Sequence, residues 1–173
     1  MAGDIFFLQH YWLSSGAAVE FVMEFLANRV SDPTTSRELA DMARAGVNLL
    51  DLSNPDCAEL VDLIVDELPS HVASLPNTQQ RDHLARIFVD LYRYALEQQD
   101  YNRDPTQETY FTIGPNPARY FCIENLERGV LSHLKQTDYV RIDVSDYTAE
   151  QRATVRNYVA ELANPRVLIV GDD

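Results

Sequence analysis

Acidic side chains recur along one predicted helix between residues 56 and 68. Glu59, Asp62 and Asp66, with Glu67 beside them, fall on about one helix face because they are spaced three or four residues apart. Carboxylates held this close repel one another and attract cations or a basic protein surface. The alternative is an ordinary solvated face. A metal ion would need oxygen ligands from several elements, and the sequence indicates only one, so no metal is predicted.

Two arginines lie on the polar stripe of a second predicted helix, Gln79 to Gln99. Arg86 and Asp90 are spaced i,i+4, and so are Arg93 and Glu97, which suits solvated ion pairs. The same stripe, on a helix that is otherwise apolar, is also suited to lining a polar cleft. In that interpretation Arg86 and Arg93 bind an anionic group.

Aromatic residues and arginines surround a rigid Gly-Pro-Asn-Pro turn at residues 114–117. Tyr and Arg dominate protein interfaces because they offer large amphipathic contact areas, although they also build cores. We expect Tyr101, Arg119 and Tyr120 to contact a partner. They join the four acidic residues of the 56–68 helix as predicted partner-binding residues.

Known catalytic patterns are missing from the sequence. The four histidines are too far apart for a paired-ligand motif, and there is no nucleophile elbow, phosphate-binding glycine loop or CxxC pair. Cys57 and Cys122 lack metal-ligand spacing and are expected to be free thiols in a reducing compartment. We therefore predict no catalytic residue and no cofactor, and expect a cytoplasmic protein.

The elements that must position these residues are mostly helices before residue 100. Val19, Val22, Met23 and Leu26 repeat at helical spacing after a possible Ser14 or Ser15 N-cap. Thr35 or Ser36 can cap a short helix that ends before Gly46, which most easily adopts the left-handed conformation. The patterns predict a strand over 4–12 and helices over 17–30, 35–45, 56–68 and 79–99.

The helix over 79–99 should be the most buried. Between Leu84 and Leu96 its polar positions form one narrow stripe, and the rest of its circumference is apolar or aromatic. Such a helix needs neighbours on several sides. We therefore expect the amino-terminal region of the fold to be organised around it.

The carboxyl-terminal region predicts a βαβ unit. An alternating strand over 139–144 precedes Thr148 and Gln151, which have the spacing of a capping box, and a helix over 148–163 leads to an apolar strand over 167–170. The two strands should be parallel, either adjacent or one strand apart. A further strand is expected over 108–113.

These elements predict an α+β fold. Its mainly helical amino-terminal region surrounds the central buried helix 79–99, and its smaller sheet is completed by the carboxyl-terminal βαβ unit. A chain of 173 residues suits a single domain, 1–173, in which the helical region (residues 1–100) and the strand-helix-strand region (residues 106–171) share one core.

Charge is the strongest global feature. The 27 acidic and 14 basic residues give a formal net charge of -13, which argues against nucleic acid as a partner because phosphate binding needs clusters of Lys and Arg. No apolar run approaches the roughly 18 to 20 residues that span a bilayer, so no membrane partner is expected. The segment from Glu38 to Glu67 is the most acidic. A salt-adapted proteome is another explanation of this acidity.

Taken together, these features favour a small acidic protein that binds and neutralises a protein partner with a basic surface, in the manner of bacterial immunity proteins and inhibitors. One alternative is a small toxin-type transferase that acts on a nucleotide or another phosphate-bearing substrate. A second alternative is a structural subunit that assembles with itself as a homo-oligomer.

Overall fold

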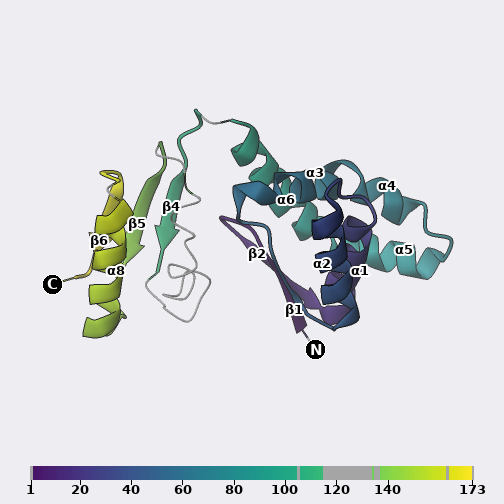
Figure 1. The fold of residues 1–173 in the computed structure, drawn as a ribbon, viewed down its shortest axis with the longest axis horizontal. Coiled ribbons are helices and arrows are strands. Elements are labelled where there is room, and N and C mark those ends of the chain that lie inside the picture. Colours follow the sequence, from purple (N-terminus) through teal and green to yellow (C-terminus); the bar gives the residue numbers. More distant parts are fainter. Residues whose placement is uncertain (1, 105, 115–133, 135–136, 163, 173) are drawn as a thin grey trace. The chain divides into compact units, whose positions relative to one another are not determined.

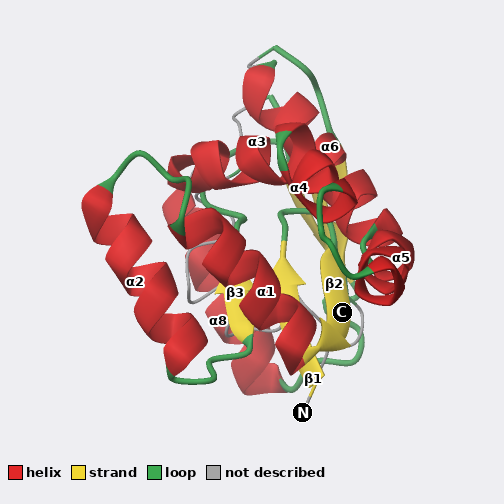
Figure 2. Cartoon of the chain, turned by 90° about the vertical axis from the view of Figure 1, so that its right-hand side faces the viewer, coloured by secondary structure: helices red, strands yellow, loops and turns green. Residues whose placement is uncertain are grey.

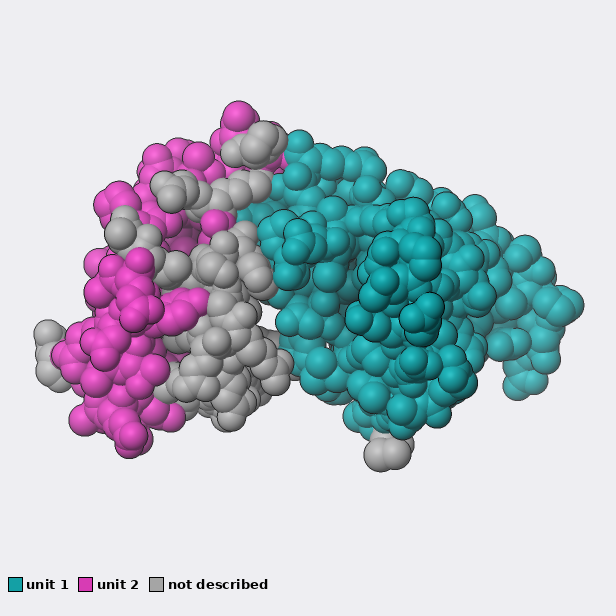
Figure 3. All heavy atoms as spheres, in the orientation of Figure 1, with its two compact units in different colours: residues 1–103 teal, residues 104–173 magenta. Residues whose placement is uncertain are grey.

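A computed structural model describes residues 2–104, 106–114, 134, 137–162 and 164–172. The chain divides into two compact units, Met1–Arg103 (unit 1) and Asp104–Asp173 (unit 2), which are coloured separately in Figure 3. The predicted α+β class is confirmed, because helices dominate unit 1 and each unit contains a three-stranded sheet. The single core predicted for the two regions stays a prediction.

Unit 1 is a small sheet with helices packed around it (Figures 1 and 2). Its sheet has the order β2-β1-β3, in which β1 is antiparallel to β2 and parallel to β3. The elements in chain order are β1 (Ala2–Phe6), β2 (Tyr11–Ser15), α1 (Gly16–Ala27), α2 (Pro33–Arg44), β3 (Leu49–Asp51), the 3-10 helix η1 (Pro55–Cys57), α3 (Ala58–Asp66), α4 (Leu68–Ala73), α5 (Thr78–Ile87) and α6 (Val89–Arg103).

The first two strands form a hairpin, so the prediction of one strand over 4–12 is wrong. Phe7 N donates to His10 O over 2.7 Å and closes the turn. Leu8 in this turn is buried, and its N–H donates to Gln98 Oε1 of α6 over 2.8 Å. The turn is held by a residue 90 positions away instead of by Gly or Asn, which explains why the local sequence does not reveal it.

Helix ends in unit 1 follow local capping rules. Ser15 caps α1 as predicted, since its Oγ accepts from Ala18 N. The cap of α2 is Asp32, with Pro33 as the first helical residue, so the predicted Thr35 or Ser36 cap is wrong. Ser36 instead donates its hydroxyl to Ala27 O at the end of α1. Gly46 has φ +66° after α2, which confirms its predicted left-handed conformation.

The segment 79–99 is not one helix, because α5 ends at Ile87 and α6 begins at Val89. Between them, the Phe88 ring is fully buried and packs edge-on against Trp12, with ring centroids 5.5 Å apart. The Trp12 indole N–H also donates to Ile87 O over 3.2 Å, which anchors the end of α5 to β2. These non-local contacts account for the break.

Among the helices that the structure describes, α1 is the most buried, so the prediction that 79–99 takes this place is wrong. Eight of the 12 residues of α1 are buried, and it contacts β1, β3, α2 and α3. Figure 2 shows α1 lying over the sheet, with α2 beside α1. By contrast, Val89 and Leu96 of α6 are 59% and 47% exposed, while the polar Gln98 and Gln99 are buried. A prediction from side-chain polarity alone therefore interchanged the buried and exposed faces of α6.

Unit 2 contains the predicted βαβ unit. Its elements are β4 (Tyr110–Ile113), β5 (Tyr139–Asp143), α8 (Ala149–Leu162) and β6 (Val167–Val170). The sheet has the order β4-β5-β6 with both pairs parallel, which confirms that β5 and β6 are parallel neighbours.

The start of α8 has the expected capping box. Thr148 N donates to Gln151 Oε1 over 2.9 Å, and Gln151 N donates to Thr148 Oγ1 over 3.2 Å. Val155 of α8 is fully buried. Among the residues that the structure describes, no helix combines the length and apolar character needed to cross a membrane.

Candidate binding pocket

Three of the predicted acidic residues of the 56–68 segment have basic partners inside unit 1. Asp62 Oδ1 accepts from Gln99 Nε2 over 2.7 Å and from Arg103 Nη2 over 3.2 Å. The same Arg103 nitrogen lies 3.6 Å from Asp66 Oδ2. These contacts join α3 to α6, so the two carboxylates have a structural role.

Glu67, between α3 and α4, pairs with Arg29, whose Nε lies 3.3 Å away. The Arg29 guanidinium also stacks over the Phe25 ring and lies 3.3 Å from His71 Nδ1. Burial, together with the positive charge of Arg29, lowers the pKa of His71 below its ordinary value. We call Asp62, Asp66 and Glu67 the paired acidic face. Partner binding by these three residues stays a prediction, because their observed contacts are intramolecular.

Glu59 belongs to a different site, a pocket of about 320 Å³ between α2, β3, η1 and α3. Apolar side chains form its inner wall, and Leu39, Leu50 and Leu60 in this wall are buried. Five carboxylates are also among the lining residues. The lining consists of Val30, Asp32, Thr35, Glu38, Leu39, Met42, Leu50, Asp51, Asp56, Cys57, Glu59 and Leu60. We call this site the acidic pocket.

Local hydrogen bonds place two of the five carboxylates. Asp32 Oδ2 accepts from Thr35 N and Thr35 Oγ1, both at 2.8 Å, at the start of α2. Donation by Thr35 lowers the pKa of Asp32, because hydrogen bonds favour the charged carboxylate. Asp51 accepts from the N–H and hydroxyl of Ser53 in the same way, at 2.9 and 2.6 Å. Neutral donors therefore fix these groups without cancelling their charge.

Glu59 accepts from Ser31 N over 2.7 Å and from Ser31 Oγ over 2.9 Å, and so links α3 to the segment between α1 and α2. Glu38 and Asp56 are exposed at the same pocket. Asp56 is positioned by Asn54, whose side-chain oxygen caps η1 by accepting from Asp56 N. Within the described ranges, none of the five carboxylates forms an ion pair, and no basic residue lines the pocket.

The pKa of the Cys57 thiol reflects the negative charge of the acidic pocket. Its thiol is partly buried, and Sγ lies 3.7 Å from Asp51 O. Burial raises the pKa of the Cys57 thiol, and the negative charges of Asp51 and Asp56 raise it further. The pocket therefore disfavours an additional negative charge and suits a positive one.

The sequence indicates part of this site. The acidic segment 38–67 includes four of the five carboxylates, but Asp32 lies outside it. The signal that was available is an Asp directly before Pro, which is a typical N-cap and N1 pair. The apolar wall was not predicted, because it depends on how α2, β3 and α3 are placed around the pocket.

The remaining predicted residues lie elsewhere. Tyr101 is 4% exposed, so its side chain is buried. Arg119 and Tyr120, together with most of the Gly-Pro-Asn-Pro turn, lie outside the described residues. Their predicted contacts with a partner stay predictions.

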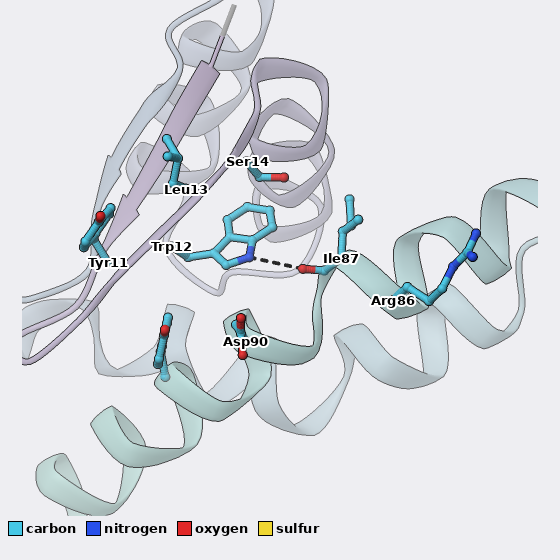
Figure 4. Close-up of a pocket in the computed structure, with 8 residues that line it drawn as sticks. Tyr11, Trp12, Leu13, Ser14, Arg86, Ile87 and Asp90 are labelled. Carbon is cyan, nitrogen blue, oxygen red and sulfur yellow. Dashed lines mark hydrogen bonds between the residues drawn. The ribbon is translucent and has the colours of Figure 1, made fainter.

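Arg86 lines a second, open groove of about 480 Å³ between β2 and the α5–α6 junction (Figure 4). Its Nε donates to Asp82 O, and Figure 4 shows its side chain extending away from Trp12. Arg93 is not among the groove residues, and it pairs with Asp90 over 3.0 Å instead of with Glu97. The structure thus does not bring Arg86 and Arg93 together at this groove, and anion binding by either stays a prediction.

The chain matches no protein-family model, no curated protein and no solved structure. Among the described residues, no group of three or more His, Cys, Asp or Glu side chains is arranged to hold a metal ion.

Proposed function

We propose that this protein binds and neutralises a protein partner with a basic surface, in the manner of an immunity protein or inhibitor. The observation that carries the proposal is the acidic pocket, where five carboxylates surround an apolar wall with no basic residue in the described lining. We place the interaction in the cytoplasm.

The charge of the pocket favours a cationic guest. Carboxylates around one depression repel one another, and a positive group from another molecule relieves this repulsion. Charges of opposite sign also steer two proteins together and raise their association rate. The negative charge of the pocket therefore favours a basic partner over a neutral or acidic one. It also favours fast association with that partner.

The apolar wall supplies the second requirement of a binding site. Buried apolar surface contributes roughly 25 cal/mol per Å² removed from water. Met42 is half-buried at the pocket, so its side chain can lose further exposure when a guest enters. Interfaces typically combine such an apolar centre with a polar rim.

The test is a capture experiment from cells that carry this protein, with the full chain immobilised. Glu38→Gln/Asp56→Asn removes two pocket charges whose carboxylates make no recorded side-chain hydrogen bond in the described structure. Glu20→Gln/Glu24→Gln is the matched control, because it removes two exposed charges from α1 that do not line the pocket.

We expect the native chain and the control to retain a protein with a basic surface, and raised salt to release it because ions screen exposed charges. The pocket variant should retain less of it. A partner that is acidic or neutral, or one whose retention ignores salt and the pocket substitutions, would contradict the proposal.

A further inference from the structure

We infer that the acidic pocket receives an arginine side chain of the partner protein. The inference rests on the proposed function and goes further by naming the group that enters. The supporting observations are the apolar and acidic lining of the pocket and the carboxylate oxygen atoms that remain available.

The lining suits a side chain with an apolar stem and a charged end. The wall formed by Leu39, Met42 and Leu60 is apolar, whereas the carboxylates come from four separate elements or their caps. Arg and Lys bury their methylene stems along apolar surface while their charged ends reach polar groups. A compact inorganic cation would leave the apolar wall without a contact.

The available oxygen atoms suit a guanidinium group. Both bonds accepted by Asp32 involve Oδ2, and both bonds accepted by the Asp51 side chain involve Oδ1. The second oxygen of each carboxylate has no recorded hydrogen bond in the described structure. Glu38 and Asp56 add further acceptors. Arg offers five donors in a planar fork, which matches acceptors distributed around a pocket better than the compact ammonium of Lys.

The experiment uses the full chain with ¹³C-labelled methionine methyl groups and follows them by NMR. Met42 lines the pocket, and Met23 is fully buried in the core of unit 1, so Met23 reports any general disturbance. The probes are three blocked pentapeptides, Gly-Gly-X-Gly-Gly, in which X is arginine, lysine or citrulline. Citrulline keeps the length and near-planar end of arginine but removes its charge.

We expect the arginine peptide to shift the Met42 signal in a saturable manner while the Met23 signal stays in place. The citrulline and lysine peptides should bind more weakly. Glu38→Gln/Asp56→Asn should weaken arginine-peptide binding by about two- to tenfold, the range for losing two exposed charge pairs. Glu20→Gln/Glu24→Gln should leave it unchanged.

Several results would overturn the inference: an unmoved Met42 signal, an equal response to citrulline, tighter binding of the lysine peptide, or equal shifts of Met23 and Met42. These results differ from failure of the proposed function. If the capture experiment yields a basic partner that depends on Glu38 and Asp56 while the peptides bind nowhere near Met42, the proposed function stands and the arginine pocket is wrong.

Discussion

Two acidic regions of unit 1 share α3 but use their carboxylates differently. In the paired acidic face, Arg103 lies close to Asp62 and Asp66, and Arg29 pairs with Glu67. In the acidic pocket, the carboxylates accept from neutral groups such as Ser31, and no ion pair is recorded for them in the described ranges. The first region uses acidity to hold helices together. In the second region, no cationic partner offsets this charge among the described residues.

The comparison shows why acidic content alone does not locate a binding site. Asp62 and Arg103 are 41 positions apart, so their contact depends on how α3 meets α6. Nothing in the local pattern of α3 distinguishes Asp62 from Glu59. Tertiary contacts decide which carboxylates have a cationic partner.

Leu60→Ala should have the largest effect, because Leu60 is a buried residue of α3 and also lines the acidic pocket. Truncating a buried leucine costs ~2 to 5 kcal/mol of stability through lost burial and the cavity that remains. Urea denaturation of this variant and of an exposed control, Arg86→Ala, provides the measurement. Equal stability of the two variants would show that the packing of Leu60 in α3 does not stabilise the paired acidic face and the acidic pocket.

Asp62→Ala should cost more stability than Asp56→Ala. Removing the Asp62 carboxylate leaves the Nε2 donor of Gln99, a residue that is 3% exposed, without the acceptor it uses. An unsatisfied buried donor costs about 1 to 3 kcal/mol. Asp56→Ala removes an exposed charge from among other acids, so we expect little loss of stability. Urea denaturation of both variants tests the ranking, and the reverse order would contradict the distinction between the two regions.

Asp56→Asn should make the Cys57 thiol react faster with iodoacetamide near pH 8. The Asp56 charge is one of the causes that raise the pKa of Cys57, so its removal lowers that pKa and increases the thiolate fraction. Burial is the main cause and remains, so we expect an increase of less than about tenfold, the change that one pKa unit produces.

The alkylation rates should be measured in a Cys122→Ser background, which leaves one cysteine. Asp62→Asn is the control from the paired acidic face, because Asp62 is not among the causes of the Cys57 shift. An unchanged rate in Asp56→Asn would remove the electrostatic evidence for the acidic pocket.

A smaller effect is expected at His71, near the paired acidic face. Burial and Arg29 lower the folded-state pKa of His71, so the unfolded chain binds a proton more readily. The contribution to stability is therefore present above the unfolded pKa of about 6.5 and is lost as pH falls through the range below it. Urea denaturation at pH 7.5 and 5 should show a smaller loss for His71→Gln than for the native chain. An equal loss would assign the pH dependence to other groups.

Local signals in the sequence predicted the features of the fold that neighbouring residues determine. The Ser15 cap, the left-handed Gly46 and the Thr148–Gln151 capping box each involve residues within a few positions of one another. The parallel pairing of β5 and β6 follows from the constraints on a βαβ crossover.

Contacts between distant residues explain what the sequence did not reveal. The hairpin turn depends on Leu8 meeting Gln98, and the end of α5 on Trp12 meeting Ile87. The acidic pocket likewise forms between residues of α2, β3, η1 and α3, which are distant in the sequence. Residue patterns within one segment carry no record of these partners, so acidity was predicted but the pocket was not.

We propose that charges of the acidic pocket, and not those of the paired acidic face, bind the basic partner. The most direct measurement is the affinity of the captured partner for the native chain, for Glu38→Gln/Asp56→Asn and for Asp66→Asn. We predict a loss of about two- to tenfold for the pocket variant, as expected for exposed charge pairs, and native affinity for Asp66→Asn. Native affinity for the pocket variant together with weaker binding by Asp66→Asn would contradict the claim and assign binding to the paired acidic face.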